Sequence, residues 1–336
     1  MEANKNYLND LLNYFALASA FSGCAYVANN FITHVFEMPG LFGFLNFIGF
    51  SQFVVQKEFT SIEAGIGFIQ ALSFLIALIA PIYIFRFQKN SFRNHAILDD
   101  FVLVLISSAF WAVLLIGIAD AIISFLRIED LLKDLVGEDL ALSLGKPPFR
   151  GTFVHLPLAV LGFLIGFFRR GIEFIWLALL IVLAELLIVF TRFIFSYEQA
   201  FMGDLVRFWY AALFLFASAY TLINDGHVRV DVIYASFSTR KKAIVNMVGS
   251  LVLGIPLCWI VLSRGLWTDS SIFNLSLLNF EVTQQGYGMY VKYIMSSFLI
   301  IFALSMLIQF SSFIISEMNK FEKFNESNNV KPKGNA

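Results

Sequence analysis

The most constraining feature of this chain is a series of long apolar segments separated by short polar breaks. About eight of them contain the roughly 17 to 25 apolar residues that a helix needs to cross a bilayer. Because so much apolar surface must face lipid, the chain cannot fold as a water-soluble domain. The segments are Leu11–Val27, Ala64–Phe85, Phe101–Phe125, Thr152–Phe168, Ile172–Phe195, Phe208–Ile223, Ala243–Leu262 and Met289–Ile315.

The composition agrees with a membrane protein. Of the 336 residues, 59% are hydrophobic and 14% are charged, whereas a soluble domain has about 25% charged residues. The basic residues are scattered and form no face interleaved with exposed aromatics, so nucleic acid is excluded as a partner. The predicted fold class is all-α: a polytopic integral membrane protein with about eight transmembrane helices and additional interfacial amphipathic helices.

Three connecting segments have the mixed pattern of helices that lie in the membrane surface. They are Phe31–Val55, Glu129–Gly145 and Tyr197–Arg207. In the second, we expect Leu132, Leu135 and Val136 on one helical face, opposite acidic side chains. Between the fourth and fifth spans, Phe167–Gly171 is so short that a tight hairpin and one long kinked helix both fit.

Lys and Arg in the loops predict the orientation, because cytoplasmic loops are enriched in them. With both termini in the cytoplasm, the inner side of the chain after residue 168 carries Arg169, Arg170, Arg229, Arg240, Lys241, Lys242 and four lysines of the tail. The outer side there keeps Arg192, Arg207, Arg264 and Lys292. In the first half the two sides are balanced.

Enzyme motifs are missing from the sequence. There is no GxxxxGK[ST], HExxH, CxxC or GxSxG pattern, and Cys24 and Cys258 lie singly in apolar runs. The histidines fall at helix ends or in loops. We therefore expect no catalytic residue, no cofactor and no metal, and we interpret the chain as a protein that is not an enzyme.

Charged residues within predicted spans are costly and become functional candidates. Asp120 and Glu185 are the clearest examples. Asp120 lies near the end of its predicted helix, where we expect it to reach water. Arg192 follows Glu185 by two helical turns, so both share one face that should meet protein. An ion or proton site and a polar contact between helices or subunits are both open for Glu185, and the contact is the favoured reading.

From Glu185 to Asp231, polar residues occur in a characteristic order. An Arg followed by an aromatic ends one span, an acid and an Arg lie in the amphipathic stretch, and a His-Val-Arg-Val-Asp loop follows the next span. The residues are Glu185, Arg192, Asp204, Arg207, His227, Arg229 and Asp231. This order and spacing resemble the small membrane subunit of tripartite ATP-independent periplasmic (TRAP) transporters.

The resemblance implies the organisation of the chain. Residues 171–317 correspond to a four-helix small-subunit domain, 1–170 to an N-terminal extension with about four more spans, and 318–336 to a disordered cytoplasmic tail. The family pattern has a Trp and paired acids where this chain has Met202, Gly203 and only Asp204. The seven polar residues are then expected to be subunit-interface or structural residues.

The resemblance also implies a function and partners. Such a subunit scaffolds a large membrane subunit that performs sodium-driven uptake of an organic acid, a carboxylate delivered by a periplasmic substrate-binding protein. The expected location is the bacterial cytoplasmic (inner) membrane. The alternative is a stand-alone membrane channel or secondary carrier, which would usually show an internal repeat or paired broken helices. We find no convincing repeat between the two halves.

Overall fold

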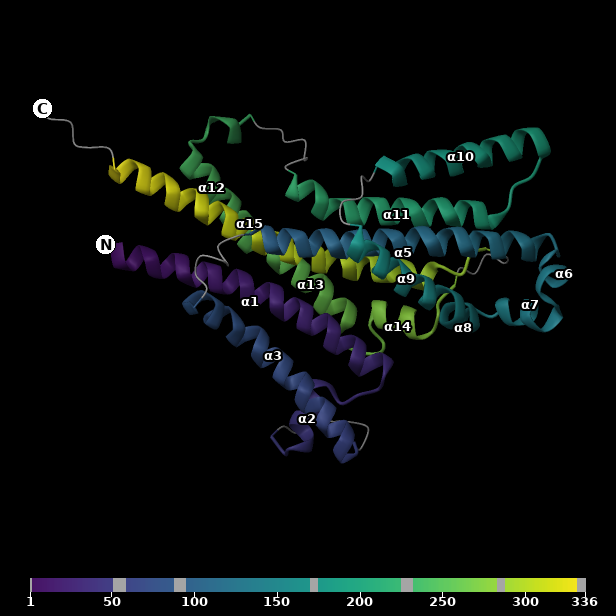
Figure 1. Cartoon of the computed structure of the whole chain (residues 1–336), viewed down its shortest axis with the longest axis horizontal. Helices are drawn as coiled ribbons and strands as arrows, with labels where there is room; N and C mark the ends of the chain where they lie inside the picture. Colours follow the sequence, from purple (N-terminus) through teal and green to yellow (C-terminus); the bar gives the residue numbers. More distant parts are fainter. Residues whose placement is uncertain are drawn as a thin grey trace, which may run out of the picture. The chain divides into compact units, whose positions relative to one another are not determined.

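The computed structural model describes residues 2–50, 59–87, 95–169, 175–224, 232–282 and 288–330. Within these ranges the chain forms helices and no strand, in the order shown in Figure 1. Eight helical segments of the described residues are long and apolar enough to cross a membrane. Each overlaps one of the eight predicted spans, so the predicted fold class is confirmed.

The chain divides into two compact units, each described here by itself. The first comprises the described residues up to Asp100, those between 232 and Trp267, and those from Met306 onward. Its helices are α1 (Glu2–Val35), α2 (Gly40–Phe47), α3 (Ser61–Phe87), η2 (Tyr234–Ser236), α12 (Thr239–Gly249), the π-helical turn η3 (Ser250–Gly254), α13 (Ile255–Leu266) and the later part of α15 (Lys292–Val330).

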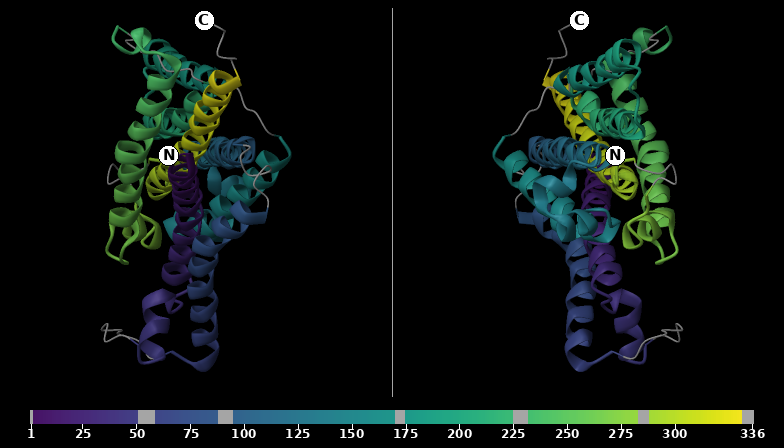
Figure 2. Two further views of the ribbon diagram at one scale, coloured as in Figure 1. Left: turned by 90° about the vertical axis from the view of Figure 1, so that its left-hand side faces the viewer. Right: turned by 90° about the vertical axis from the view of Figure 1, so that its right-hand side faces the viewer.

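Helices α1 and α3 lie side by side as an antiparallel pair, with α2 at their joined end (Figure 2). Polar side chains connect them inside the apolar surroundings. Asn29 Nδ2 donates to Ser73 Oγ at 2.6 Å, and the buried Gln70 amide donates to Thr33 Oγ1 at 3.0 Å. The Gln70 Oε1 also accepts the backbone N–H of Gly40 at 3.0 Å, which attaches the start of α2 to α3.

The second unit comprises the described residues from Phe101 to Asn224 and from Thr268 to Ser305. It contains most of α5 (Ala96–Ile128), then α6 (Leu132–Val136), α7 (Glu138–Leu144), α8 (Pro147–Arg150), the π-helical turn η1 (Gly151–His155), α9 (Leu156–Phe168), α10 (Ile175–Phe195), α11 (Ala200–Ile223), α14 (Ile272–Leu278) and the first part of α15.

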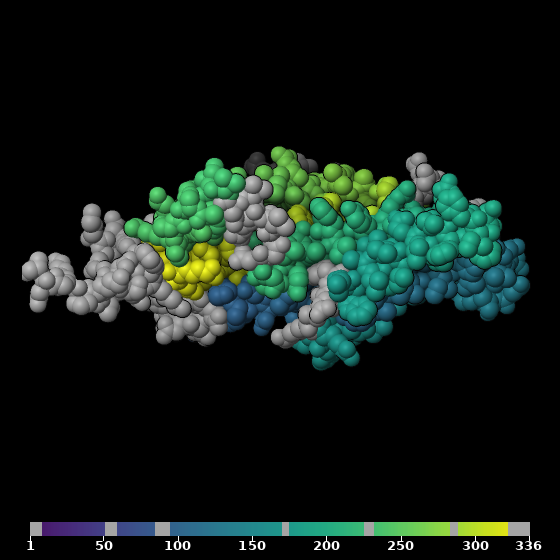
Figure 3. Space-filling model, turned by 90° about the horizontal axis from the view of Figure 1, so that it is seen from above, coloured from purple at the N-terminus to yellow at the C-terminus, as the bar shows by residue number. Residues whose placement is uncertain are grey.

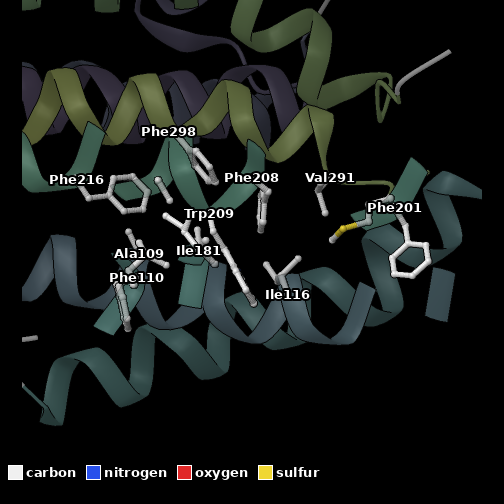
Figure 4. Packing of buried hydrophobic residues seen from close by; sticks show 14 of the residues in the cluster. Ala109, Phe110, Ile116, Ile181, Phe201, Phe208, Trp209, Phe216, Val291 and Phe298 are labelled. Carbon is white, nitrogen blue, oxygen red and sulfur yellow. The ribbon is translucent and has the colours of Figure 1, made fainter. Parts of the chain in front are cut away.

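Large apolar side chains from α5, α10, α11 and α15 form the core of this second unit. Figure 4 shows Trp209 of α11 reaching toward α5, where its indole occupies the space that a side chain at Gly117 would need. Phe208 and Phe216 pack on Phe298 of α15, with ring centroids 5.2 Å apart in each pair. The region of the resemblance therefore shares one core with α5, which precedes it in sequence.

Helix α9 approaches α5 through two glycines spaced by four residues. A Cβ on Gly162 would lie 2.3 Å from the backbone N of Ala112, and a Cβ on Gly166 would lie 2.3 Å from Cα of Ser108. Backbones come this close only where small residues face each other, as in small-xxx-small packing of membrane helices. The α5–α9 pair is thus fixed by backbone proximity.

Two predictions about interfacial helices need correction. Glu129–Gly145 is two short helices, because Gly137 adopts a positive φ of 85° between α6 and α7. Of its predicted apolar face only Leu132 is buried, and Leu135 stays 65% exposed. Tyr197–Arg207 is not a separate surface helix either, since α11 starts at Ala200 and continues through the span.

Other boundaries also differ from those expected. The predicted interfacial segment Phe31–Val55 includes the end of α1 and the short α2, and residues 51–58 lie outside the described ranges. Helix α15 continues to Val330, so helix occupies most of the segment for which disorder is predicted. Near Phe167–Gly171, α9 ends at Phe168 and α10 begins at Ile175. Helix α10 packs along α11 (Figure 1).

Candidate functional site

The predicted pair Glu185 and Arg192 lies on the outer surface of α10. Both side chains are exposed, and Glu185 has no polar partner among the described residues. Arg192 Nε lies 3.3 Å from the Glu198 carboxylate instead. Ile181 and Leu177, one and two helical turns before Glu185, are buried in the core, so Glu185 lies at the edge of the packed face of α10. No helix of the described part of the chain packs against the exposed side chains of Glu185 and Arg192. The prediction that they contact a neighbouring helix therefore stays a prediction.

Asp204 and Arg207 occupy the first two turns of α11. Their side chains are 3.6 Å apart, with Arg207 largely exposed and Asp204 mostly covered. Asp204 Oδ2 accepts the backbone N–H of Met289 at 3.1 Å. This carboxylate therefore ties the start of α11 to the segment before α15. The remaining predicted residues, His227, Arg229 and Asp231, lie outside the described residues.

The most concentrated polar arrangement in the second unit surrounds Asp120, in the last third of α5. This carboxylate has no accessible surface, so the expectation that it reaches water is wrong. Its Oδ1 accepts hydrogen bonds from Arg150 Nη1 at 2.8 Å and His155 Nε2 at 3.0 Å. Its Oδ2 accepts the backbone N–H of Tyr290 at 2.8 Å. We call Asp120, Ser124, Arg150, His155, Tyr290 and Tyr293 the Asp120 cluster.

Local helix geometry brings these side chains to one point. Ser124 follows Asp120 by one turn on the same face of α5 and accepts a hydrogen bond from Arg150 Nη1 at 3.2 Å. Arg150 immediately precedes the π-helical turn η1 and His155 is its last residue, and the wider repeat of this turn brings residues five apart to one side. Gly151 opens this turn because the Phe280 ring and the Tyr293 hydroxyl fill the space of a side chain.

Tyr290, just before α15, and Tyr293, in the first turn of α15, complete the Asp120 cluster. His155 Nε2 donates to Asp120, and His155 Nδ1 shares a second hydrogen bond of 2.7 Å with the hydroxyl of Tyr293. Tyr290 stacks near Arg150, whose guanidinium carbon is 4.2 Å from the ring centroid. Its hydroxyl donates to the carbonyl of Gly145 at 2.9 Å. The N–H and hydroxyl of Tyr290 and the hydroxyl of Tyr293 are therefore hydrogen-bonded to residues between α5 and η1.

The centre of the Asp120 cluster is a buried ion pair between Asp120 and Arg150. One carboxylate is matched by one guanidinium, and both carboxylate oxygens already accept hydrogen bonds. Among the described residues no group of three His, Cys, Asp or Glu side chains is placed to hold a metal ion. Buried charges in membrane helices are usually paired in this way, which stabilises contacts between helices.

Residues 178–317 match the family model described as "Tripartite ATP-independent periplasmic transporters, DctQ component". This region is similar to that family. The predicted resemblance to a TRAP small subunit is therefore confirmed for this part of the chain, and the family is a transporter component and not an enzyme family. No curated protein and no solved structure matches the chain.

The DctQ region and the residues before it share the Asp120 cluster. Tyr290 and Tyr293 belong to the DctQ region, whereas Asp120, Arg150 and His155 precede it. Sequence reasoning identified Asp120 but not its partners, and it placed His155 at a helix end without a role. One available signal was Arg150 and His155 at the edge of an apolar run, since such residues are expensive in lipid unless paired.

Proposed function

We propose that this protein is the small membrane subunit of a TRAP transporter and works beside a large membrane subunit. The observation that carries this proposal is the DctQ match over residues 178–317, in a chain with eight candidate membrane spans. The large subunit performs sodium-driven uptake of an organic acid, and a periplasmic binding protein delivers the carboxylate substrate. The complex lies in the inner membrane, with both termini of this subunit in the cytoplasm.

The proposed role of this subunit is that of a scaffold, and α10 is the proposed contact helix. All but its first three residues lie within the DctQ region, and it is the least buried candidate span of the described residues. Figure 3 shows its teal surface on the face seen from above. Apolar residues such as Val182, Leu186 and Val189 are exposed there beside Glu185. Lipid can cover the apolar residues, but an unpaired carboxylate in a span requires a polar partner.

The other polar residues of the pattern have supporting roles in this proposal. Asp204 and Arg207 orient the start of α11, next to the contact helix. His227, Arg229 and Asp231 form part of the connection between α11, which ends at Ile223, and α12, which begins at Thr239. In the predicted orientation this connection faces the cytoplasm, and the basic residues Arg240–Lys242 hold the following helix end on that side.

The test replaces the exposed polar residues of α10 in the full transporter. Glu185→Gln and Arg192→Ala are expected to lower recovery of the large subunit with the tagged small subunit, and to lower sodium-driven uptake in proportion. Glu138→Gln is the matched control, because it removes an exposed carboxylate outside the DctQ region. Normal recovery of the large subunit combined with abolished uptake would contradict the scaffold role and indicate a direct ion role for Glu185.

A further inference from the structure

A cleft of about 620 Å³ lies at the end of α5, beside α6 and α7. It is open to the surface, and the proposed transport role does not use it. The polar residues and glycine among its lining are Arg127, Asp130, Lys133, Gly145, Lys146 and Tyr290. The cleft therefore combines cationic side chains with an aromatic wall.

Positive charge exceeds negative charge in the lining. Arg127, Lys133 and Lys146 face a single carboxylate, that of Asp130. Asp130 is 3.2 Å from Lys133, and Lys146 is exposed with no ion-pair partner among the described residues. The guanidinium of Arg127 is 4.6 Å from the Tyr290 ring centroid and donates to the carbonyl of Gly288. The lining therefore favours a ligand that carries negative charge.

The nearby acidic residues do not cancel this charge inside the cleft. Asp134, Glu138 and Asp139 lie on α6 and α7 but do not line it. Glu129 accepts a hydrogen bond from the hydroxyl of Tyr197 at 2.6 Å. Arg150, with no accessible surface, lies behind the Tyr290 wall and is balanced by Asp120. The lysines of the lining thus retain a local excess of positive charge.

The cleft has the depth in the membrane that a lipid headgroup occupies. Helix α5 has 33 residues, which span about 50 Å, whereas the hydrocarbon core is about 30 Å thick. Arg127 is in the last turn, so the cleft lies beyond the hydrocarbon end of the span. Leu135 and Leu142 of α6 and α7 are 65% and 59% exposed beside it. Basic groups beside exposed leucines match the boundary between phosphates and acyl chains.

We propose that this cleft binds the phosphodiester headgroup of an anionic phospholipid. The ammonium groups of Lys133 and Lys146 contact the phosphate oxygens together with Arg127, and the exposed leucines contact the first part of the acyl chains. A lysine near an anionic membrane surface contributes about a fivefold gain in affinity. The bound lipid then holds the α6–α7 segment on the membrane surface.

The test measures lipids retained by the full-length protein. The protein is exchanged into mixed vesicles or detergent micelles containing equal amounts of phosphatidylglycerol and phosphatidylcholine, and bound lipid is counted by native mass spectrometry. The wild type is expected to retain phosphatidylglycerol preferentially. The Lys133→Gln/Lys146→Gln variant is expected to weaken this preference by about 25-fold, because each of the two lysines contributes about fivefold. Arg264→Gln, a change of a single exposed basic residue on α13, is the matched control and should keep it.

A second variant should increase the retention of phosphatidylglycerol. Asp130→Asn removes the carboxylate that competes for Lys133, and Asn tolerates the positive φ of 59° at this position. Phosphatidylglycerol retention should increase. Equal retention of both lipids by the wild type, or an unchanged preference in the double lysine variant, would overturn the proposal. Competition by inorganic phosphate without lipid preference would also overturn it, because it would show a site for a soluble anion.

Discussion

Asp120 and Arg150 form an ion pair with a 2.8 Å contact, and neither side chain has any surface exposed to solvent or lipid. Thirty positions separate them in the sequence, and they meet because α5 and the α8–η1 turn pack within one unit. The pair also supports His155 and the N–H of Tyr290. It therefore connects the residues before the DctQ region to the DctQ region itself.

Breaking this ion pair should destabilise the protein strongly. Arg150→Met or Asp120→Leu leaves one uncompensated buried charge, which costs about 3 to 5 kcal/mol. We expect a large drop in the thermal unfolding temperature of the detergent-solubilised protein for each single variant. The double variant removes both charges and should recover part of the loss. Recovery stays incomplete because the Tyr290 N–H and His155 lose their acceptor. A double variant as unstable as the sum of the singles would contradict direct pairing.

The α5–α9 contact should not tolerate added side-chain volume. Gly162→Leu places atoms where the Ala112 backbone lies, and Gly166→Ala places a methyl group against the Ser108 backbone. We expect reduced yield and a lower unfolding temperature for both variants, because overpacking lowers the free energy of unfolding by about 1 to 3 kcal/mol. Gly203→Ala in α11 is the control, because nothing lies within 4 Å of the added methyl group. It should be neutral or stabilising by up to about 1 kcal/mol. Equal effects at all three glycines would refute the close contact.

Gln70 should contribute more to the stability of the protein than other polar residues of the spans do. Gln70→Leu leaves the N–H of Gly40 and the hydroxyl of Thr33 without this partner, which costs about 1 to 2 kcal/mol. The measurement is thermal unfolding, with protease accessibility of the α2 region as a second readout. Ser263→Ala on α13 is the comparison, since that hydroxyl bonds only to its own helix. A stable Gln70→Leu variant with protected α2 would argue against this attachment.

Tyr197 should titrate at unusually high pH. Burial and the hydrogen bond to the Glu129 carboxylate raise the pKa of Tyr197 from 10.0 to about 12. Because folding raises this pKa, the neutral phenol stabilises the folded state below pH 10, and that contribution is lost as the pH rises through about 12. The difference in absorbance at 295 nm between the wild type and Tyr197→Phe measures the titration. Glu129→Gln should shift the transition toward 10, and no shift would show that Glu129 is not responsible.

Several parts of the fold were predictable because they depend on local composition. The eight spans follow from the length of each apolar run, and their helical state follows from the need to satisfy backbone polar groups within lipid. The order from Arg192 to Asp231 predicted the DctQ relationship because it depends only on residue types and spacing. The structure of the amphipathic segment Glu129–Gly145 was harder to predict, because Gly137 adopts a positive φ and divides the segment into two helices.

The sequence by itself determined the class of the protein, its spans and the similarity of residues 178–317 to the DctQ family. Only the tertiary structure decided which polar residues meet. Asp120 finds Arg150, His155 and Tyr290 from distant segments, whereas Glu185 remains on an open face of α10. Helical periodicity places a side chain on one side of its own helix, but it does not reveal what packs against that side. That depends on helix packing, and therefore on small residues such as Gly162 and Gly166 that let backbones approach.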